Sequence, residues 1–398
     1  MHVLISAVSS SRHPTGICRH AANLARCLAA RDEVSQITVL TGAEQTHYFE
    51  LAFQLRDRKL TMISANVGGG SVARNRWYME GLPKAAKQCA ADIVHLSFPV
   101  PFARESFSCP VVTSLHDLYP YDIPRNFGFP RVIFNRLFLR QCLRSSDAIV
   151  CGSEFTLSRL RAIAESAVTS KALRIYQCVE SNPANIRRPL LPDTGGRPFL
   201  LCVAQHRRNK NLALLIRAFA ELRRPGGRHR MLCLVIVGAD GPETASLKKL
   251  VRQLALRHHV AFVSSLADPE LCWLYRNCEL FVAPSSIEGF GLPVVEALQY
   301  GARAVCSDIP AFRETAGNAC QYFDLRAPSP AASLAEAVSV ALQEPPRRPE
   351  GLHRFSAKEV AAQYVSMYSR LLAGQRAGAD SQPLISTDPA FSYDRLAG

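Results

Sequence analysis

The sequence predicts an α/β protein built from two doubly wound parallel sheets that face each other across a central cleft. Short apolar runs alternate with longer segments of helical period through most of the 398 residues, as is typical of parallel strands joined by crossover helices. This alternation occurs twice, on either side of a stretch rich in proline and glycine. Because ligands bind beyond the carboxyl ends of the strands in such sheets, we expect a ligand to be held between the two halves.

The first half, residues 1–184, repeats strand and helix in the manner of a Rossmann-like domain. Its strands are expected at residues 2–8, 36–40, 92–97, 110–116, 147–153 and 173–176, and its clearest helices at 16–30 and 131–146. Residues 185–197 then contain prolines and a Gly-Gly step without periodicity, which predicts an interdomain linker.

The second half, residues 198–354, repeats the pattern and is expected to form a second Rossmann-like domain. Its strands are expected at 199–204, 231–238, 260–265 and 280–285, and its helices at 211–224, 243–256, 269–278 and 292–302. Residues 355–373 have the period of an amphipathic helix, which we expect to pack back on the first domain. Residues 374–398 are polar and aperiodic, which indicates a disordered tail.

The composition indicates which cellular compartment and which binding partners to expect. The net charge of +14 favours phosphate-rich ligands and anionic membranes, whereas nucleic acid is not expected because no recognition motif accompanies the charge. Thirteen cysteines without a CxxC pair argue against a disulfide framework and a structural zinc site, and indicate a cytoplasmic protein. No apolar stretch approaches the roughly 20 residues that span a bilayer, so we expect any membrane contact to be peripheral, on the inner face of the cytoplasmic membrane.

Residues 285–298, SSIEGFGLPVVEAL, place two glutamates around a glycine-rich turn from strand to helix. The backbone N–H groups and the helix dipole at such a turn favour phosphate, and Gly289 and Gly291 would let a ligand approach closely. A tight turn without a ligand would need the same glycines. Glu288 precedes the helix and Glu296 lies about one turn inside it, so the carboxylates could contact two parts of one extended ligand. Alternatively, Glu288 caps the helix and Glu296 faces solvent.

The longer stretch PSSIEGFGLPVVEALQYGARAVCSDIPAFRETAG resembles the donor-binding signature of retaining glycosyltransferases of family four, which have the two-domain GT-B fold. Outside this stretch the resemblance extends from residue 1 to about residue 372, with fewer matching positions. It implies that the second domain binds a nucleotide-diphosphate sugar. Glu288 would contact the transferred sugar and stabilise positive charge at its anomeric carbon, and Glu296 would hold the ribose hydroxyls. The remaining contacts to sugar and phosphate would come from Gly289, Phe290, Gly291 and Leu292.

Further positions in both halves carry the same resemblance. Lys210, at the start of a helix, matches the lysine of the family's diphosphate grip, with Arg207 and Arg208 as candidate partners; a basic loop is otherwise a solvated turn. His116, at the end of a buried strand, matches a histidine that reaches the donor sugar, although a lone histidine is often structural. Gly16 matches a glycine that lets the loop after the first strand close over the diphosphate.

The resemblance implies a hexosyltransferase with no cofactor and no metal site. The sequence has no DxD motif, and none is expected if Lys210, arginines and helix dipoles neutralise the leaving diphosphate. The expected donor is GDP-mannose or a UDP-sugar, and the expected acceptor is a glycan or lipid-linked molecule of cell-surface polysaccharide, lipopolysaccharide or glycolipid biosynthesis. Two alternatives are a nucleotide-sugar epimerase on the same architecture and an inactive nucleotide-sugar-binding protein; the paired glutamates speak against both.

Residues 124–144 interleave arginines with phenylalanines. Arg136, Arg140 and Arg144 are spaced four residues apart and would form one stripe on a helix. One interpretation is that this segment touches anionic lipid or a lipid-linked diphosphate acceptor. The other is an ordinary domain helix whose aromatic side lies in the core and whose arginines face water.

Overall fold

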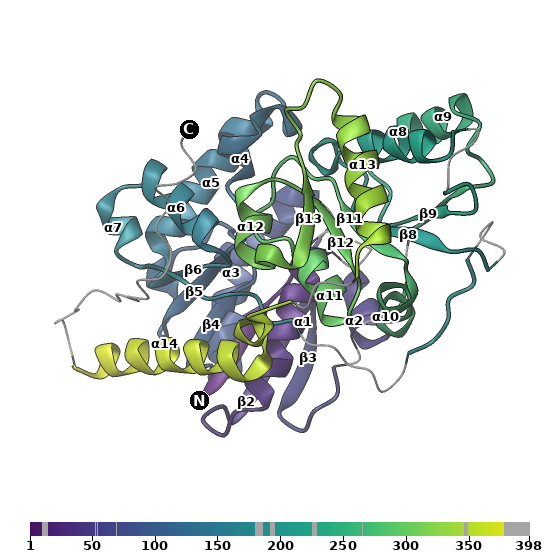
Figure 1. Cartoon of the computed structure of the whole chain (residues 1–398). Helices are drawn as coiled ribbons and strands as arrows, with labels where there is room; N and C mark the ends of the chain where they lie inside the picture. The colour runs from purple at the N-terminus through teal and green to yellow at the C-terminus, as the bar shows by residue number, and fades with distance from the viewer. Residues whose placement is uncertain are drawn as a thin grey trace.

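The computed structural model of the chain describes residues 1–9, 15–51, 53, 55–68, 70–179, 186–191, 196–224, 229–264, 266–345 and 349–377. These residues form two α/β domains, each built on a parallel sheet (Figure 1). The first sheet has seven strands in the order β3-β2-β1-β4-β5-β6-β7, and the second has six in the order β10-β9-β8-β11-β12-β13. Both orders are those of doubly wound sheets, as the sequence predicts.

The central strands of the first domain are short apolar segments buried on both faces, which explains their continuous hydrophobic runs. The strands are β1 (His2–Ser6), β2 (Gln36–Gly42), β3 (Leu60–Ala65), β4 (Ile93–Leu96), β5 (Val111–Leu115), β6 (Ala148–Cys151) and β7 (Ala172–Arg174). The helices are α1 (Gly16–Ala29), α2 (Ala43–Leu51), α3 (Gly70–Gln88), α4 (Tyr119–Asp122), α5 (Arg131–Ser145), α6 (Glu154–Ile163) and α7 (Ser166–Thr169). The strand order reverses between β1 and β4, so their carboxyl ends form the switch point at which such sheets bind ligands.

The second domain repeats this plan, with its switch point between β8 and β11. The strands are β8 (Phe199–Val203), β9 (Cys233–Val237), β10 (Val260–Val263), β11 (Leu280–Ala283), β12 (Ala304–Ser307) and β13 (Cys320–Phe323). The helices are α8 (Leu212–Leu222), α9 (Thr244–Gln253), α10 (Asp268–Asn277), α11 (Leu292–Gln299), α12 (Pro310–Ala316) and α13 (Pro330–Gln343).

Each strand and helix expected by residue range is present, with its ends shifted by a few residues. The strands β3, β12 and β13 and the helices α2, α3, α4, α6, α7, α12 and α13 were not among the expected elements. The missed strands are four to six residues long, and α3 contains Pro83. Among the described helices, none combines the length and the apolar character needed to cross a bilayer.

The last helix, α14 (Ala357–Ala377), runs from the second domain back along the first (Figure 1). Val360, Tyr364 and Tyr368 of this helix are buried in the cluster that also contains the apolar side of α1. The helix ends at Ala377 rather than at the expected residue 373, so it includes the start of the expected disordered tail.

Two expected segments are only partly described. Of the expected linker 185–197, residues 186–191 and 196–197 are described, and these are neither helix nor strand. Residues 378–398 of the expected tail lie outside the described residues.

The two domains contact each other at the start of α6. Ser153 Oγ donates a hydrogen bond to the carbonyl oxygen of Gly289. The carboxylate of Glu314 accepts hydrogen bonds from the backbone N–H groups of Glu154 at 2.6 Å and Phe155 at 3.0 Å. A carboxylate of the second domain therefore caps a helix of the first, where the helix dipole favours negative charge. An apolar cluster beside this contact contains Tyr176, Phe290, Val295 and Phe355.

Candidate active site

The turn between β11 and α11 brings the second domain against the backbone of the first. Gly291 has a φ of +90°, and a Cβ at this position would lie 2.6 Å from the ring of Phe312. A Cβ on Gly289 would lie 1.7 Å from the carbonyl oxygen of His116. Contacts within the protein therefore already require both glycines. The close approach that we expected from a ligand is made at Gly289 by the first domain.

Glu288 lies between the two domains and contacts both. Its Oε1 lies 2.5 Å from Nζ of Lys210 in the second domain. Its Oε2 accepts a hydrogen bond of 3.4 Å from the hydroxyl of Tyr119 in the first domain. The N-cap residue of α11 is Gly291, so the alternative in which Glu288 caps this helix is wrong. The carboxylate instead faces the crevice between the domains.

This crevice gathers ionisable groups from both domains. It is lined by Asp117, Leu118, Tyr119, Asp122, Phe155, Thr156, Arg159, Ile287, Glu288 and Gly289. Burial, helped by the nearby charge of Glu288, raises the pKa of Asp117 to about 6, although a hydrogen bond from the backbone N–H of Tyr119 and the charge of Lys210 oppose this rise. The crevice therefore combines a carboxylate paired with a lysine and a second carboxyl group that gains a proton near pH 6.

Lys210 is placed by a 3₁₀ turn, Arg208–Lys210, that follows β8. Asn211, with a φ of +49°, then turns the chain into α8. Arg207 and Arg208 are both exposed. Arg207 is close enough to Tyr119 for its charge to oppose the rise in the pKa of the Tyr119 hydroxyl, which is caused mainly by burial. The positive charge of Arg207 therefore acts on a residue of the crevice.

Glu296 is only 7% exposed, so the alternative in which it faces solvent is wrong. Its Oε2 accepts a hydrogen bond of 2.7 Å from the hydroxyl of Tyr275, and its Oε1 lies 3.5 Å from Nε of Arg19 on α1. Arg19 also pairs with Asp268 at 2.7 Å. Burial raises the pKa of Glu296, and Arg19 and Tyr275 oppose that rise. The carboxylate expected to hold a ribose thus also joins the two domains.

His116 lies at the end of β5, as expected, but both of its ring nitrogens have protein partners. Nε2 donates to the carbonyl oxygen of Ser97 at 2.7 Å. Nδ1 is therefore the acceptor nitrogen, and Gln177 Nε2 donates to it at 3.4 Å. Burial lowers the pKa of His116, so the ring is neutral at pH 7. This arrangement positions the backbone of His116 against Gly289 and holds the ring in one tautomer.

The imidazole of His116 belongs to a buried histidine cluster. Its ring lies 4.6 Å from that of His20, edge to face. His20 and His95 both reach the hydroxyl of Ser114, at 3.0 and 2.8 Å, and Nδ1 of His95 lies 2.6 Å from the hydroxyl of Tyr368 on α14. Burial lowers the pKa of all three histidines, to about 3 for His95. The cluster connects α1, β4, β5 and α14 through neutral side chains.

Three other predicted site residues, Phe290, Leu292 and Gly16, differ in which of their atoms could contact a ligand. The side chains of Phe290 and Leu292 are buried in the apolar cluster between the domains. Only their backbone atoms could therefore make the predicted contacts to sugar and phosphate. Gly16 is the first residue of α1 rather than a loop residue, and Thr15 is the N-cap. This start agrees with the helix expected at residues 16–30. Residues 10–14 of that loop lie outside the described residues.

Several residues that complete the site were missed in the sequence. Asp117 directly follows His116, so the strand end could have pointed to it. The other missed residues are Arg19, Tyr119, Gln177 and Tyr275. Nothing in the local sequence separates these from ordinary helix and loop residues, because each is brought to the site by tertiary contacts.

Two doubly wound domains that enclose a crevice with a lysine–glutamate pair define a protein with the GT-B fold. The description "Glycosyl transferases group 1" matches residues 185–358, and the description "Glycosyltransferase Family 4" matches residues 14–169. The chain therefore belongs to the family-four, group 1 glycosyltransferases. The resemblance seen in the sequence and the predicted fold are thus confirmed.

Named relatives and solved structures agree with this assignment. The O-antigen chain mannosyltransferase B of Escherichia coli is 28% identical over 214 residues, 52% of this chain and 55% of that protein. The chain therefore spans about half the length of this relative. The O-antigen biosynthesis glycosyltransferase WclY of Escherichia coli is 24% identical over 66% of this chain and 72% of its own.

The solved structures that are similar to this chain extend over nearly all of it. Sucrose-phosphate synthase from Thermosynechococcus elongatus has a TM-score of 0.71 at 18% identity, covering 94% of this chain and 99% of its own. Alr3699/HepE from Anabaena, solved with UDP and glucose, has a TM-score of 0.61 at 18% identity and covers 95% and 99%. At these identities the likeness establishes the fold.

Proposed function

We propose that this chain transfers a hexose from a nucleotide-diphosphate sugar to a glycan or lipid-linked acceptor, with retention of anomeric configuration. The observation that carries the proposal is the pairing of Glu288 with Lys210 in a crevice lined by both domains. A carboxylate beside the anomeric carbon stabilises an oxocarbenium-like transition state, and a cation beside the diphosphate stabilises the leaving group. Glu288 supplies the carboxylate and Lys210 supplies the cation.

The donor would lie across the carboxyl ends of β8 and β11, with its diphosphate at Lys210 and Arg207. Glu296 would hold the ribose hydroxyls, and the N–H groups at the start of α11 would contact sugar and phosphate. Lys210 and Arg207 supply positive charge without a metal ion, so we propose metal-independent transfer. An oxygen of the departing phosphate would accept the proton of the attacking acceptor hydroxyl on the same face of the sugar.

The relatives suggest which donor and acceptor to examine first. Two of them are named for O-antigen mannosyl or glycosyl transfer, and Alr3699/HepE was solved with UDP and glucose. We therefore propose GDP-mannose or a UDP-sugar as donor and a cell-surface polysaccharide or glycolipid precursor as acceptor. A cytoplasmic location with peripheral attachment to the inner face of the cytoplasmic membrane would give the enzyme access to both.

A panel of GDP-, UDP- and ADP-sugars tests this proposal. Thermal stabilisation identifies the base, slow hydrolysis without an acceptor identifies the sugar, and NMR of the freshly released or transferred sugar gives its anomeric configuration. We expect one sugar nucleotide to be hydrolysed equally well with and without EDTA. Epimerised sugar nucleotide in place of hydrolysis or transfer would favour the epimerase alternative, and stabilisation without turnover by any donor or acceptor would favour an inactive binding protein.

A further inference from the structure

Helix α5 and the residue before it expose an apolar surface that we call the α5 face. Thirteen large apolar side chains are exposed among the described residues, and five of them lie in this one segment. These are Phe129, Ile133, Phe134, Leu137 and Phe138, which are 84%, 46%, 53%, 53% and 40% exposed. At about 100° per residue, the four helical members fall within an arc of roughly 140°. A contiguous apolar surface on one helix indicates an interaction site.

The helix is attached to the domain by its other side. Leu139, Cys142 and Leu143, in its C-terminal half, are buried, whereas its N-terminal half has no buried residue. The sequence-based alternative, in which the phenylalanine side of this helix lies in the core, is therefore wrong. Packing of α5 on its own domain leaves the phenylalanines uncovered.

Positive charge flanks the α5 face. The stretch from residue 123 to residue 145 contains five arginines and no acidic residue. Arg136 donates to the carbonyl oxygen of Pro120 at 2.9 Å, and Arg140 donates to the hydroxyl of Tyr121 at 2.9 Å. Arg144 pairs with Glu165 at 2.5 Å. The guanidinium groups of Arg136 and Arg140 are thus held beside the apolar surface by contacts with α4 and are oriented before any partner binds.

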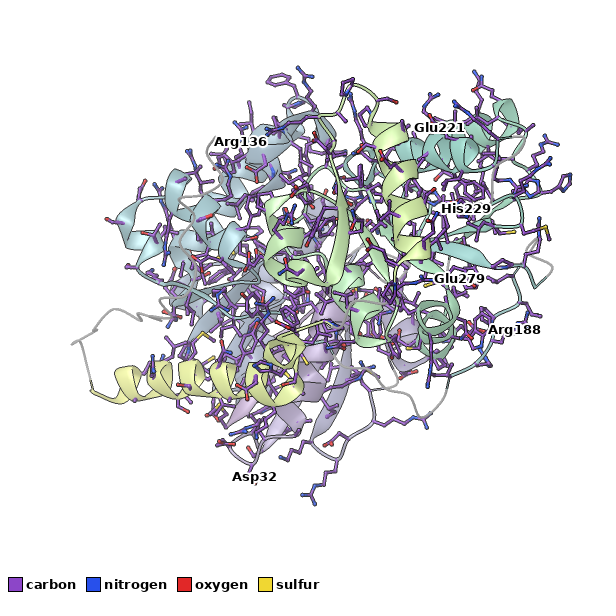
Figure 2. All side chains as sticks on the ribbon, in the orientation of Figure 1. Asp32, Arg136, Arg188, Glu221, His229 and Glu279 are labelled. Carbon is purple, nitrogen blue, oxygen red and sulfur yellow. The ribbon has the colours of Figure 1, made fainter. Side chains whose placement is uncertain are left out.

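The α5 face is also connected to the crevice through α4. A hollow of about 120 Å³, lined by both apolar and charged side chains, lies between α5, α6 and α7. Leu118 lines both this hollow and the crevice that contains Glu288, and Arg140 and Arg144 line the hollow. Figure 1 shows α4, α5, α6 and α7 grouped on one side of the first domain, and Figure 2 labels Arg136 at the top of the molecule, to the left of Glu221 of α8.

We propose that the α5 face docks on an anionic lipid bilayer, with its phenylalanines and leucine at the boundary of headgroups and acyl chains and its arginines against lipid phosphates. Aromatic and aliphatic side chains flanked by arginine have the chemistry of helices that lie in a membrane interface. Charge complementarity favours lipid phosphate over a neutral apolar partner. The docking surface stands independently of the proposed transfer reaction, and α4 would place the crevice beside the membrane surface.

Vesicle flotation of the full chain tests the docking surface. We expect the protein to float with vesicles of phosphatidylglycerol and phosphatidylcholine, and much less with phosphatidylcholine alone or in 0.5 M NaCl. Phe134→Ser combined with Leu137→Ser should lower binding by about tenfold or more, because two apolar side chains leave the interface. Arg125→Gln combined with Arg131→Gln should lower binding selectively on the anionic vesicles.

The matched control is Val72→Ser combined with Met79→Ser, which replaces two exposed apolar residues of α3 and should float like the parent chain. Melting temperature and stabilisation by the sugar nucleotide confirm that each variant is folded and binds donor, so a failure of docking is distinguishable from a failure of the proposed transfer. The proposal is overturned if the parent chain does not float with anionic vesicles, or if the Phe134/Leu137 variant floats as well as the parent. It is also overturned if light scattering shows a parent dimer that this variant lacks.

Discussion

Nζ of Lys210 lies 2.5 Å from Oε1 of Glu288, although the two residues are separated by 78 positions in the chain. Their loops follow β8 and β11, which are adjacent in the sheet. Parallel strands place their carboxyl ends at one edge, so the topology brings the two loops together. A donor that placed its diphosphate at Lys210 would therefore have its sugar within reach of Glu288.

Replacement of Glu288 by Gln tests the proposed catalytic carboxylate. The amide has nearly the same shape but carries no negative charge, so it should bind the nucleotide and fail to stabilise the oxocarbenium-like state. We expect transfer to fall by about 10²-fold or more, as for removal of a strong electrostatic contact in the transition state, while the Kd for the nucleoside diphosphate changes by less than about threefold. Calorimetry and single-turnover assays measure the two quantities. Transfer at the parent rate would show that the assignment is wrong.

Replacement of Glu296 by Ala tests the predicted ribose contact. We expect the Kd of the nucleoside diphosphate to rise by about tenfold or more, since paired hydrogen bonds between a carboxylate and hydroxyls are lost. Tyr275→Phe is the matched variant, because it removes the 2.7 Å hydrogen bond to this carboxylate but keeps the negative charge. Binding by the Tyr275 variant should change less. Equal losses in the two variants would assign Glu296 a purely structural role.

Replacement of Gly289 by Ala tests the contact between the domains. The new Cβ would lie 1.7 Å from the backbone oxygen of His116, which cannot move without separating the domains. We expect the free energy of unfolding to fall by about 1–3 kcal/mol and transfer to fall with it. Gly16→Ala is the control, because no heavy atom lies within 4 Å of its added Cβ, and its stability should stay the same or rise slightly. Equal stability of the two variants would contradict the close contact.

The buried histidine cluster predicts a loss of stability in acid. Burial lowers the pKa of His20, His95 and His116 in the folded state, so the unfolded chain takes up more protons once the pH falls below about 6.5. Stability contributed by the neutral rings is present above pH 6.5 and is lost as the pH falls, by up to about 1.4 kcal/mol per pH unit for each histidine.

Denaturant unfolding at pH 7.5, 6.5 and 5.5 measures this slope. His95→Gln should reduce the slope, because one of the three histidines no longer takes up a proton on unfolding. A slope in the His95 variant equal to that of the parent chain would contradict the proton linkage, even if the variant were less stable at every pH.

Most of the secondary structure and part of the site could be read from the chain. Strands such as β1 and β9 are continuous apolar runs because both of their faces are covered, and this pattern survives in the sequence. The four-residue strands β12 and β13 are too short to give a periodic signal, and Pro83 interrupts the helical pattern of α3. Glu288 and Glu296 were singled out because they stand on either side of a strand-to-helix turn, and Lys210 because its loop resembles the diphosphate grip of the family.

The sequence by itself determined the class of most elements and singled out the candidate site residues of the second-domain loops, since both depend on short-range patterns. Only the tertiary structure decided what those groups touch: Tyr119 reaches Glu288 from the other domain, and Arg19 reaches Glu296. It also decided that the phenylalanines of α5 are exposed. The physical reason is that periodicity identifies the apolar side of a helix but not the layer that covers it. Strand order and domain packing bring distant residues together, and no local spacing records that order.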